Sequence, residues 1–191
     1  FEAKTINHAL ANGLDQIGEN RVQELLDKYD LVQPKAWHLI GHLQTNKVKY
    51  IIDKVSLIHS VDSLRLLEEI NSQALKHGIT ANVLVQVNIS GEASKFGVNK
   101  DDVEHILYGA AGCSNIKIRG LMAIAANLDN SNTIRLQFDD MNWLYIDIAA
   151  KKYDNVSMEY LSMGMSGDFT SAIEAGSNMV RIGSLLFGSR L

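Results

Sequence analysis

The hydrophobic positions in this chain follow two periods in turn, and the alternation predicts strands and helices from one end to the other. Nearly continuous runs of valine, isoleucine and leucine are typical of parallel strands covered on both faces, whereas apolar residues three and four positions apart are typical of helices. Strands are expected at residues 14–18, 37–40, 55–61, 81–89, 116–123, 158–162 and 178–182. Helices are expected at about residues 3–12, 21–28, 45–52, 62–78, 101–111, 133–152 and 170–175.

Residues 62–78 carry the clearest helix signal. Asp62 is a residue type that caps helix N-termini, and Gly78 suits the position just after the last turn. The apolar residues of this segment share one helical face, which holds Leu66, Leu67, Ile70 and Ala74. The segment is therefore expected to pack on the sheet formed by the strands on either side of it.

Seven strands with helices between them predict a parallel sheet with right-handed crossovers. We expect an α/β fold of the (β/α)8 TIM-like barrel type, formed by residues 1–191 as one domain. A closed barrel needs an eighth strand, and the chain opens on a helix, so its first strand is expected upstream of Phe1 and the domain is expected to be N-terminally incomplete. The alternative is a doubly wound open sheet, but no G-x-G-x-x-G follows the first strand.

The composition changes this picture little. The 191 residues are 46% hydrophobic and 21% charged, with a net charge of −4, and basic residues do not cluster, so a nucleic-acid surface is not expected. No apolar run approaches the roughly 20 residues of a membrane helix. The single cysteine, Cys113, indicates a reducing compartment, and we expect a cytoplasmic protein.

The last two predicted strands run directly into glycine and serine, as Ser166-Gly167 and Gly183-Ser184. In a (β/α) barrel the C-terminal ends of the strands meet at one mouth, and the turns after the last two often hold a phosphate. Backbone N–H groups and small hydroxyls suit that anion. Ser166, Gly167, Gly183 and Ser184 are therefore candidate phosphate ligands. The alternative is that these residues only form tight turns and helix caps.

Arg181 lies among apolar neighbours in the last strand, where an arginine is rarely left unpaired. It is expected either to pair with a strand acid such as Glu159 or to donate to a ligand atom at the barrel mouth, because arginine only donates hydrogen bonds. Asn20 follows the strand at 14–18 and either caps the next helix or contacts the ligand. His38, within a strand, is expected to be a satisfied core residue, and no metal-ligand spacing is present.

Several motifs occur together over the whole chain, namely Gly18-Glu-Asn-Arg-Val-Gln-Glu24, Trp37-His-Leu-Ile-Gly-His-Leu-Gln-Thr-Asn-Lys47, His59-Ser-Val-Asp62, Gln86-Val-Asn88, Lys95-Phe-Gly97, Gly120-Leu-Met122 and the two glycine-serine turns. In this combination the chain resembles the pyridoxal 5′-phosphate (PLP) homeostasis protein family. The resemblance implies a PLP-binding barrel like the N-terminal domain of alanine racemase.

The same resemblance implies a role for each candidate. Ser166, with Gly167, and the Gly183-Ser184 turn would hold the phosphate of PLP. Arg181 would face the pyridine nitrogen, and Asn20 would lie near the ring. In the family a lysine in a Ser-Lys-Thr-like motif forms the Schiff base, and that motif is expected just upstream of Phe1. Lys4 and Lys47 do not match it, so no catalytic residue is assigned in this chain.

The resemblance therefore implies a non-catalytic carrier and regulator of intracellular PLP. PLP-dependent apoenzymes are its expected partners, and the protein is expected to be a monomer. The first alternative is a PLP-dependent amino-acid racemase-like enzyme, which would need acid–base groups on both faces of the substrate carbon. The second is a barrel enzyme acting on another phosphorylated metabolite, with Glu19 or Asp62 as its general base.

Overall fold

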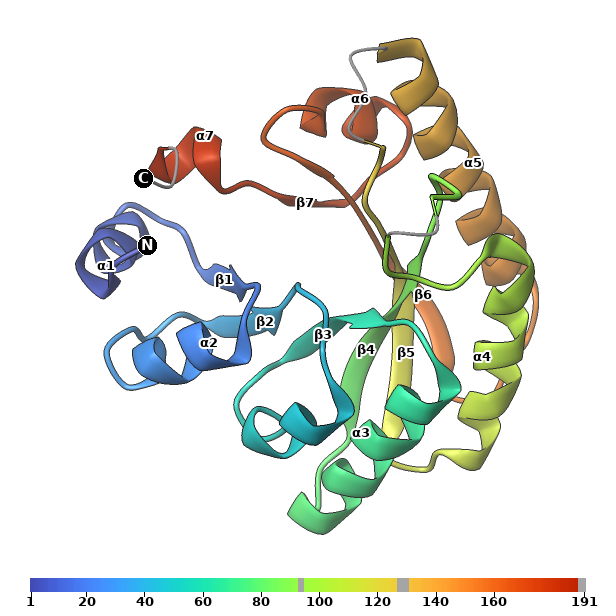
Figure 1. The fold of residues 1–191 in the computed structure, drawn as a ribbon, viewed down its shortest axis with the longest axis horizontal. Helices are drawn as coiled ribbons and strands as arrows, with labels where there is room; N and C mark the ends of the chain where they lie inside the picture. The colour runs from blue at the N-terminus through green and yellow to red at the C-terminus, as the bar shows by residue number, and fades with distance from the viewer. Residues whose placement is uncertain (93–94, 127–130, 189–191) are drawn as a thin grey trace.

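A computed structural model describes residues 1–92, 95–126 and 131–188 of the chain (Figure 1). One sheet of seven parallel strands runs through it, and the strands lie side by side in the order in which they occur in the sequence. The strands are β1 (Gln16–Glu19), β2 (Ala36–Leu39), β3 (Leu57–Val61), β4 (Ala81–Val87), β5 (Ile116–Ala123), β6 (Val156–Met165) and β7 (Met179–Arg181).

Helical segments connect the strands and cover the outside of the curved sheet (Figure 1). The α-helices are α1 (Ala3–Ala11), α2 (Val22–Tyr29), α3 (Leu64–His77), α4 (Val103–Gly109), α5 (Ser131–Ala150), α6 (Phe169–Glu174) and α7 (Ser184–Phe187). Three short 3-10 helices accompany them, η1 (Thr45–Tyr50), η2 (Lys100–Asp102) and η3 (Ala110–Gly112).

The two faces of the sheet bury different side chains, as a barrel requires. Leu57, Leu84 and Met122 form a small apolar cluster inside the curve of the sheet. Their neighbours along the same strands, such as Ile58 and Leu121, belong instead to the larger cluster between sheet and helices. Because successive side chains of a strand point to opposite faces, β3, β4 and β5 each contribute to both clusters.

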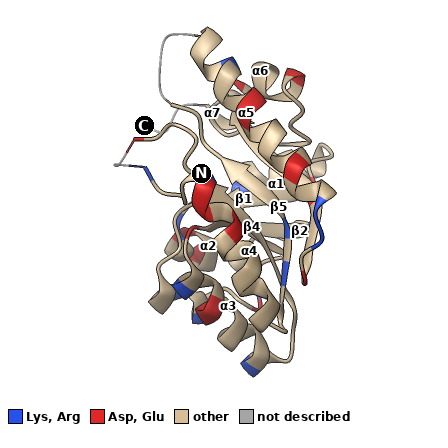
Figure 2. Cartoon of the chain, turned by 90° about the vertical axis from the view of Figure 1, so that its right-hand side faces the viewer, with Lys and Arg blue, Asp and Glu red and all other residues tan. Residues whose placement is uncertain are grey.

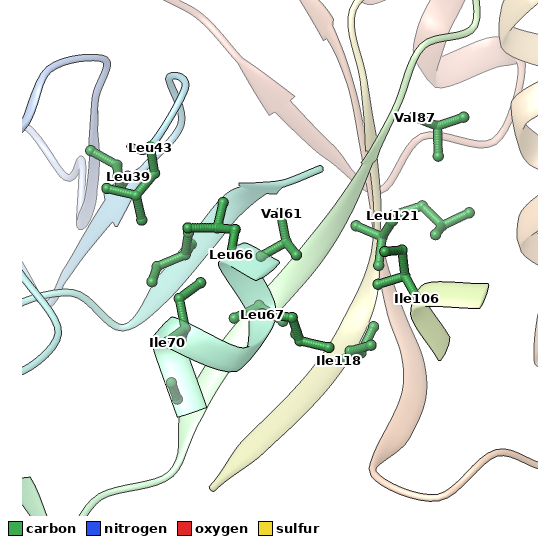
Figure 3. Packing of buried hydrophobic residues seen from close by; sticks show 14 of the residues in the cluster. Leu39, Leu43, Val61, Leu66, Leu67, Ile70, Val87, Ile106, Ile118 and Leu121 are labelled. Atoms are coloured by element: carbon green, nitrogen blue, oxygen red, sulfur yellow. The ribbon is translucent and has the colours of Figure 1, made fainter. Parts of the chain in front are cut away.

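The larger cluster holds the helices on the sheet (Figure 3). Leu66, Leu67 and Ile70 of α3 are fully buried beside the strands, and Ile106 of α4 lies close to Leu121 of β5. Ala74 is also fully buried, so the predicted apolar face of the segment 62–78 is confirmed. This packing fixes the strands whose C-terminal ends form the barrel mouth.

The sequential strand order confirms the predicted barrel arrangement and excludes the doubly wound sheet, in which the order reverses. The barrel is nearly closed. In the part of the chain that the structure describes, β1 and β7 are the two edge strands and do not pair with each other. The rings of Phe1 and Phe187 lie 5.0 Å apart, which brings the ends of the described chain together beside the opening (Figure 1).

Three local predictions differ from the structure. Ser63 rather than Asp62 caps α3, because its Oγ accepts a hydrogen bond from the Leu66 amide at 3.3 Å. The helix expected at 45–52 is the 3-10 segment η1, and the strand expected at 158–162 extends over all ten residues of β6.

The charged residues do not form a separate layer. Figure 2 views the molecule from the side of α4 and α5 and shows acidic and basic residues interspersed among the others on the helices. Among the described helices, none is both long enough and apolar enough to cross a membrane.

Candidate functional site

A cavity of about 350 Å³ lies between the edge strands β1 and β7. Its volume falls in the usual range for small-molecule sites, which is roughly 300–1,000 Å³. Residues from β1, β2, β3, β7 and both ends of the described chain line it. Of the residues predicted from the sequence, Asn20, Arg181 and Gly183 are among them. The cavity therefore joins candidates from opposite ends of the chain.

Arg181 ends β7, and its guanidinium is held by neutral oxygen atoms. Nη1 donates to the Ser162 carbonyl oxygen at 2.9 Å and to the Ser162 Oγ at 2.7 Å, and Nη2 donates to the Ala123 carbonyl oxygen at 2.8 Å. These bonds leave Nε–H and one Nη2 hydrogen without an acceptor among the described residues. Since Arg181 lines the cavity, these are the donors it can offer a ligand.

The proposed pair of Arg181 with Glu159 does not form. Glu159 is paired with Arg119 on β5 instead. Burial lowers the pKa of Arg181 to about 10, partly offset by the negative charge of Asp168. Arg181 is therefore still a cation at neutral pH, and a partly buried cation without a paired acid favours an anionic or electron-rich ligand.

Ser166 and Gly183 are joined directly. The Ser166 Oγ accepts hydrogen bonds from the backbone N–H groups of Gly183 and Leu185, both at 3.2 Å. Both lone pairs of the oxygen are then used, and its own hydrogen is free to be donated. The two glycine-serine turns thus form one unit at the C-terminal ends of β6 and β7.

Ser166, Gly167 and Ser184 are not among the residues that line the cavity; Gly167 and Ser184 are exposed, and Ser166 is partly buried. Ser184 is the first residue of α7, and Gly183 occupies the position before it. The structure thus brings Ser166 and Gly183 into contact, and of the four turn residues Gly183 lines the cavity.

Asn20 follows β1 and lines the cavity, so it does not act as the cap of α2. Arg21 occupies that position and makes no side-chain capping bond. The backbone of Asn20 also lies against Gly41, where a Cβ atom would come within 2.1 Å of the Asn20 carbonyl oxygen. Gly41 therefore lets the chain after β2 approach the chain after β1, which fixes the position of Asn20.

Sequence reasoning missed two residues of the site, His59 on β3 and Ser162 on β6. His59 Nε2 lies 3.0 Å from His38 Nδ1, and His59 Nδ1 lies 3.1 Å from the Ser162 Oγ that accepts from Arg181. His38, His59 and Ser162 are all almost fully buried. Each is a polar residue within an apolar strand, at a position facing the barrel interior, and this was the available signal. His38 is largely buried, as expected of a core residue, but its ring also lines the cavity and its hydrogen-bond partner is a second histidine.

Burial lowers the pKa of His38. The pKa of His59 lies well below its ordinary value, first because the ring is buried and then because His38 and Arg181 lie nearby. Both rings are therefore neutral at physiological pH, and a neutral imidazole has one donor and one acceptor nitrogen.

The two candidate general bases have other partners. Glu19 lines the cavity but is held by the Lys28 Nζ at 2.6 Å, with both side chains largely buried. Asp62 pairs with His42 at 3.2 Å, and the His42 ring stacks on Phe96 at a centroid distance of 3.9 Å. Neither carboxylate is free to accept a proton from a substrate without losing its partner. The described residues contain no group of three side chains suited to a metal ion.

The family model for the alanine racemase N-terminal domain matches residues 2–191 of the chain. The pyridoxal phosphate homeostasis protein of Aquifex aeolicus is 46% identical over 180 residues, which span 93% of this chain and 78% of that protein. The protein of the same name from Escherichia coli K12 is 37% identical over 193 residues, which span 98% and 81%.

Solved structures agree with these sequence relatives. PipY of Synechococcus elongatus with PLP bound has a TM-score of 0.85 and 30% identity over 97% of this chain and 87% of that one. The structure of PipY without PLP has a TM-score of 0.91 and 32% identity over the same shares. The chain therefore belongs to the alanine racemase N-terminal domain family and, within it, to the pyridoxal phosphate homeostasis proteins.

Proposed function

We propose that this protein binds PLP in the cavity between β1 and β7 and takes part in PLP homeostasis as a carrier that catalyses no reaction. In this proposal Arg181 faces the pyridine nitrogen, Asn20 contacts the ring, and the unit of Ser166, Gly167, Gly183 and Ser184 holds the phosphate. PLP supplies an aldehyde that condenses with amines, attached to a pyridine ring that can accept electrons.

One observation carries the proposal. Arg181 is a partly buried cation whose three hydrogen bonds all go to neutral oxygen atoms, and its remaining N–H groups belong to a side chain that lines the cavity. A donor-only group suits an unprotonated ring nitrogen, which can only accept. The Ser166 hydroxyl hydrogen and the exposed turn next to it suit a phosphate oxygen. The residues present thus fit PLP.

The residues of the chain would each limit what bound PLP can do. Arg181 keeps the ring nitrogen unprotonated, which weakens the ring as an acceptor of electrons. The ion pair with Lys28 engages the carboxylate of Glu19, which lines the cavity, and so opposes proton transfer by it. No lysine is among the described residues that line the cavity. This environment supports holding PLP rather than using it for chemistry.

The direct test is PLP binding by equilibrium dialysis. Arg181→Met and Ser166→Ala should each raise the Kd for PLP about tenfold, because each removes hydrogen bonds to the ligand worth about 1.4 kcal/mol. Arg135→Met is the matched control, because Arg135 pairs with Asp139 and Glu174 on the surface. Unchanged Kd values for both site variants would refute this site.

The non-catalytic role is tested separately. A racemase-like enzyme needs a base and an acid on opposite faces of the substrate carbon. Among the described residues that line the cavity, His38 and His59 are the neutral titratable side chains, and they contact each other. Turnover of amino acids between their mirror-image forms, measured with PLP present, should be absent. Turnover that His38→Gln removes would support the racemase-like alternative instead.

The remaining proposals concern the whole protein. We propose that residues 1–191 act as a single PLP-binding domain, that the protein is a monomer, and that it passes PLP to apoenzymes in the cytoplasm. The unpaired thiol of Cys113 supports a reducing compartment. Light scattering after size-exclusion chromatography tests the monomer, and recovery of activity by a PLP-free apoenzyme supplied with the loaded protein tests transfer.

A further inference from the structure

Four side chains from four strands form a continuous chain of polar contacts through the barrel interior. His38 of β2 contacts His59 of β3 at 3.0 Å, His59 contacts the Ser162 Oγ of β6 at 3.1 Å, and that oxygen accepts from Arg181 of β7 at 2.7 Å. His59 and Ser162 are 103 positions apart in the sequence. This chain of polar contacts links β2, which lies next to one edge of the sheet, with β7 at the other edge.

The direction of each hydrogen bond follows from Arg181, which can only donate. Ser162 Oγ accepts from Arg181, and its own hydrogen needs an acceptor because Ser162 is fully buried. Among the described residues, His59 Nδ1 is the atom placed to accept it. The opposite direction would leave the serine hydroxyl hydrogen unsatisfied, so His59 carries its proton on Nε2.

The same reasoning continues to His38. The Nε2–H of His59 donates to His38 Nδ1, so His38 also carries its proton on Nε2. No acceptor for that N–H occurs among the residues that the structure describes. His38 lines the cavity, and its Nε2 lies on the side of the ring away from His59. The chain of hydrogen bonds therefore begins at one donor of the cavity, Arg181, and ends at another, His38.

This arrangement explains how Arg181 is held without an acid. A carboxylate partner would neutralise the guanidinium and compete with an anionic ligand for its N–H groups. The neutral chain of Ser162 and two histidines orients the guanidinium. Its positive charge is not neutralised by a protein carboxylate and can therefore interact with the ligand. Burial lowers the pKa of both histidines, which keeps them neutral and preserves the direction of the chain.

We propose that Ser162, His59 and His38 are positioning residues that form a one-way hydrogen-bond relay, which orients Arg181 and presents the His38 Nε2–H to the bound ligand. The relay rests on the proposed function for its ligand, PLP. The site would then select a ring that offers an unprotonated nitrogen to Arg181 and a second acceptor, such as a ring oxygen, to His38.

The relay itself is tested on the ligand-free protein. Nitrogen-15 NMR of labelled histidines should show His38 and His59 both neutral and both protonated on Nε2. Ser162→Ala removes the donor to His59 Nδ1 and should release His59 into a mixture of both tautomers. Ser177→Ala is the control, because its buried hydroxyl bonds only to backbone carbonyl groups of β6 and β7. Protonation of His59 on Nδ1 in the unchanged protein would overturn the proposal.

The positioning role is tested with PLP as the ligand. Glutamine can copy the relay, since its oxygen accepts and its nitrogen donates, whereas leucine cannot. His59→Leu should raise the Kd for PLP about tenfold, and His59→Gln should stay within about twofold of the original value. Equal losses in both variants, or no loss in either, would refute a positioning role.

This design distinguishes failure of the relay from misfolding of a variant and from failure of the proposed PLP binding. If His59→Leu loses its cooperative unfolding transition, Ser162→Ala replaces it in the binding measurement, with Ser177→Ala as its control and the same tenfold expectation. If the unchanged protein does not bind PLP, the proposed function fails, while the histidine tautomers still decide whether the relay exists.

Discussion

At the scale of single residues, the site depends on groups whose charge is set by burial. Arg181 remains a cation because its pKa falls only to about 10, whereas His38 and His59 become neutral because burial lowers their pKa. Among the described side chains that line the cavity, Arg181 carries a positive charge, and the residues that hold its guanidinium are neutral. This difference makes the stability of the protein sensitive to pH.

Acid should destabilise the protein below a pH of about 6.5, the ordinary pKa of histidine. The unfolded chain binds protons at His59 there, but the folded chain does not, so the free energy of unfolding falls as the pH falls. One such histidine contributes up to about 1.4 kcal/mol per pH unit. Urea unfolding at several pH values should show this slope, and His59→Gln should reduce it.

The matched control for this prediction is His105→Gln, because His105 is exposed on α4 and leaves both buried histidines in place. It should keep the slope of the unchanged protein. A slope that is the same in the His59→Gln variant would show that other groups cause the acid sensitivity.

At the scale of elements, close contact between neighbouring strands shapes the barrel. Gly120 of β5 has a φ of +144°, and a Cβ atom there would lie 1.9 Å from the Tyr160 carbonyl oxygen of β6. The pairing of β5 with β6 shifts register between Ile118 and Gly120. A glycine is needed at this bend because no side chain fits between the two backbones.

Gly120→Ala should therefore lower the free energy of unfolding by about 3 kcal/mol, through overpacking and a strained φ. Gly112→Ala is the control, since a Cβ atom at Gly112 would meet nothing within 4 Å. Urea unfolding of both variants checks the prediction. A loss below about 0.5 kcal/mol in Gly120→Ala would contradict it.

At the scale of the whole molecule, the cavity lies where the sheet is open. Residues of β1 and β7 line it together, although these edge strands do not pair in the described chain. A ligand in the cavity would therefore contact both edge strands, beside the rings of Phe1 and Phe187, which lie 5.0 Å apart.

PLP should therefore slow amide hydrogen exchange in both β1 and β7, because binding stabilises the state in which the two edges are held together. At 100 times its Kd, PLP should add about 2.7 kcal/mol to the free energy of unfolding. The central strands β4 and β5 serve as an internal control, because they line no part of the cavity. Protection confined to β7 would contradict a site that spans the opening.

Much of the fold could be predicted from the sequence because hydrophobic periodicity is local. The seven strands and the buried face of α3 follow from spacing within each segment, and the parallel arrangement follows from the alternation of strands with helices. One local error lies at an element boundary, where Ser63 replaces Asp62 as the cap, and another concerns the type of helix, since a 3-10 segment stands where an α-helix was expected. Several residue types can satisfy a helix terminus equally well, so the sequence alone does not choose among them.

The sequence by itself determined which residues stand at the ends of the strands, because alternation locates each strand and its end. Ser166, Arg181 and Gly183 were found in this way, and Arg181 was recognised as needing a partner. Only the tertiary structure decided that the partner is Ser162 rather than Glu159, and that His59 and His38 continue the chain. Such contacts join strands far apart in the sequence, and they depend on the curvature that turns one face of each strand inward.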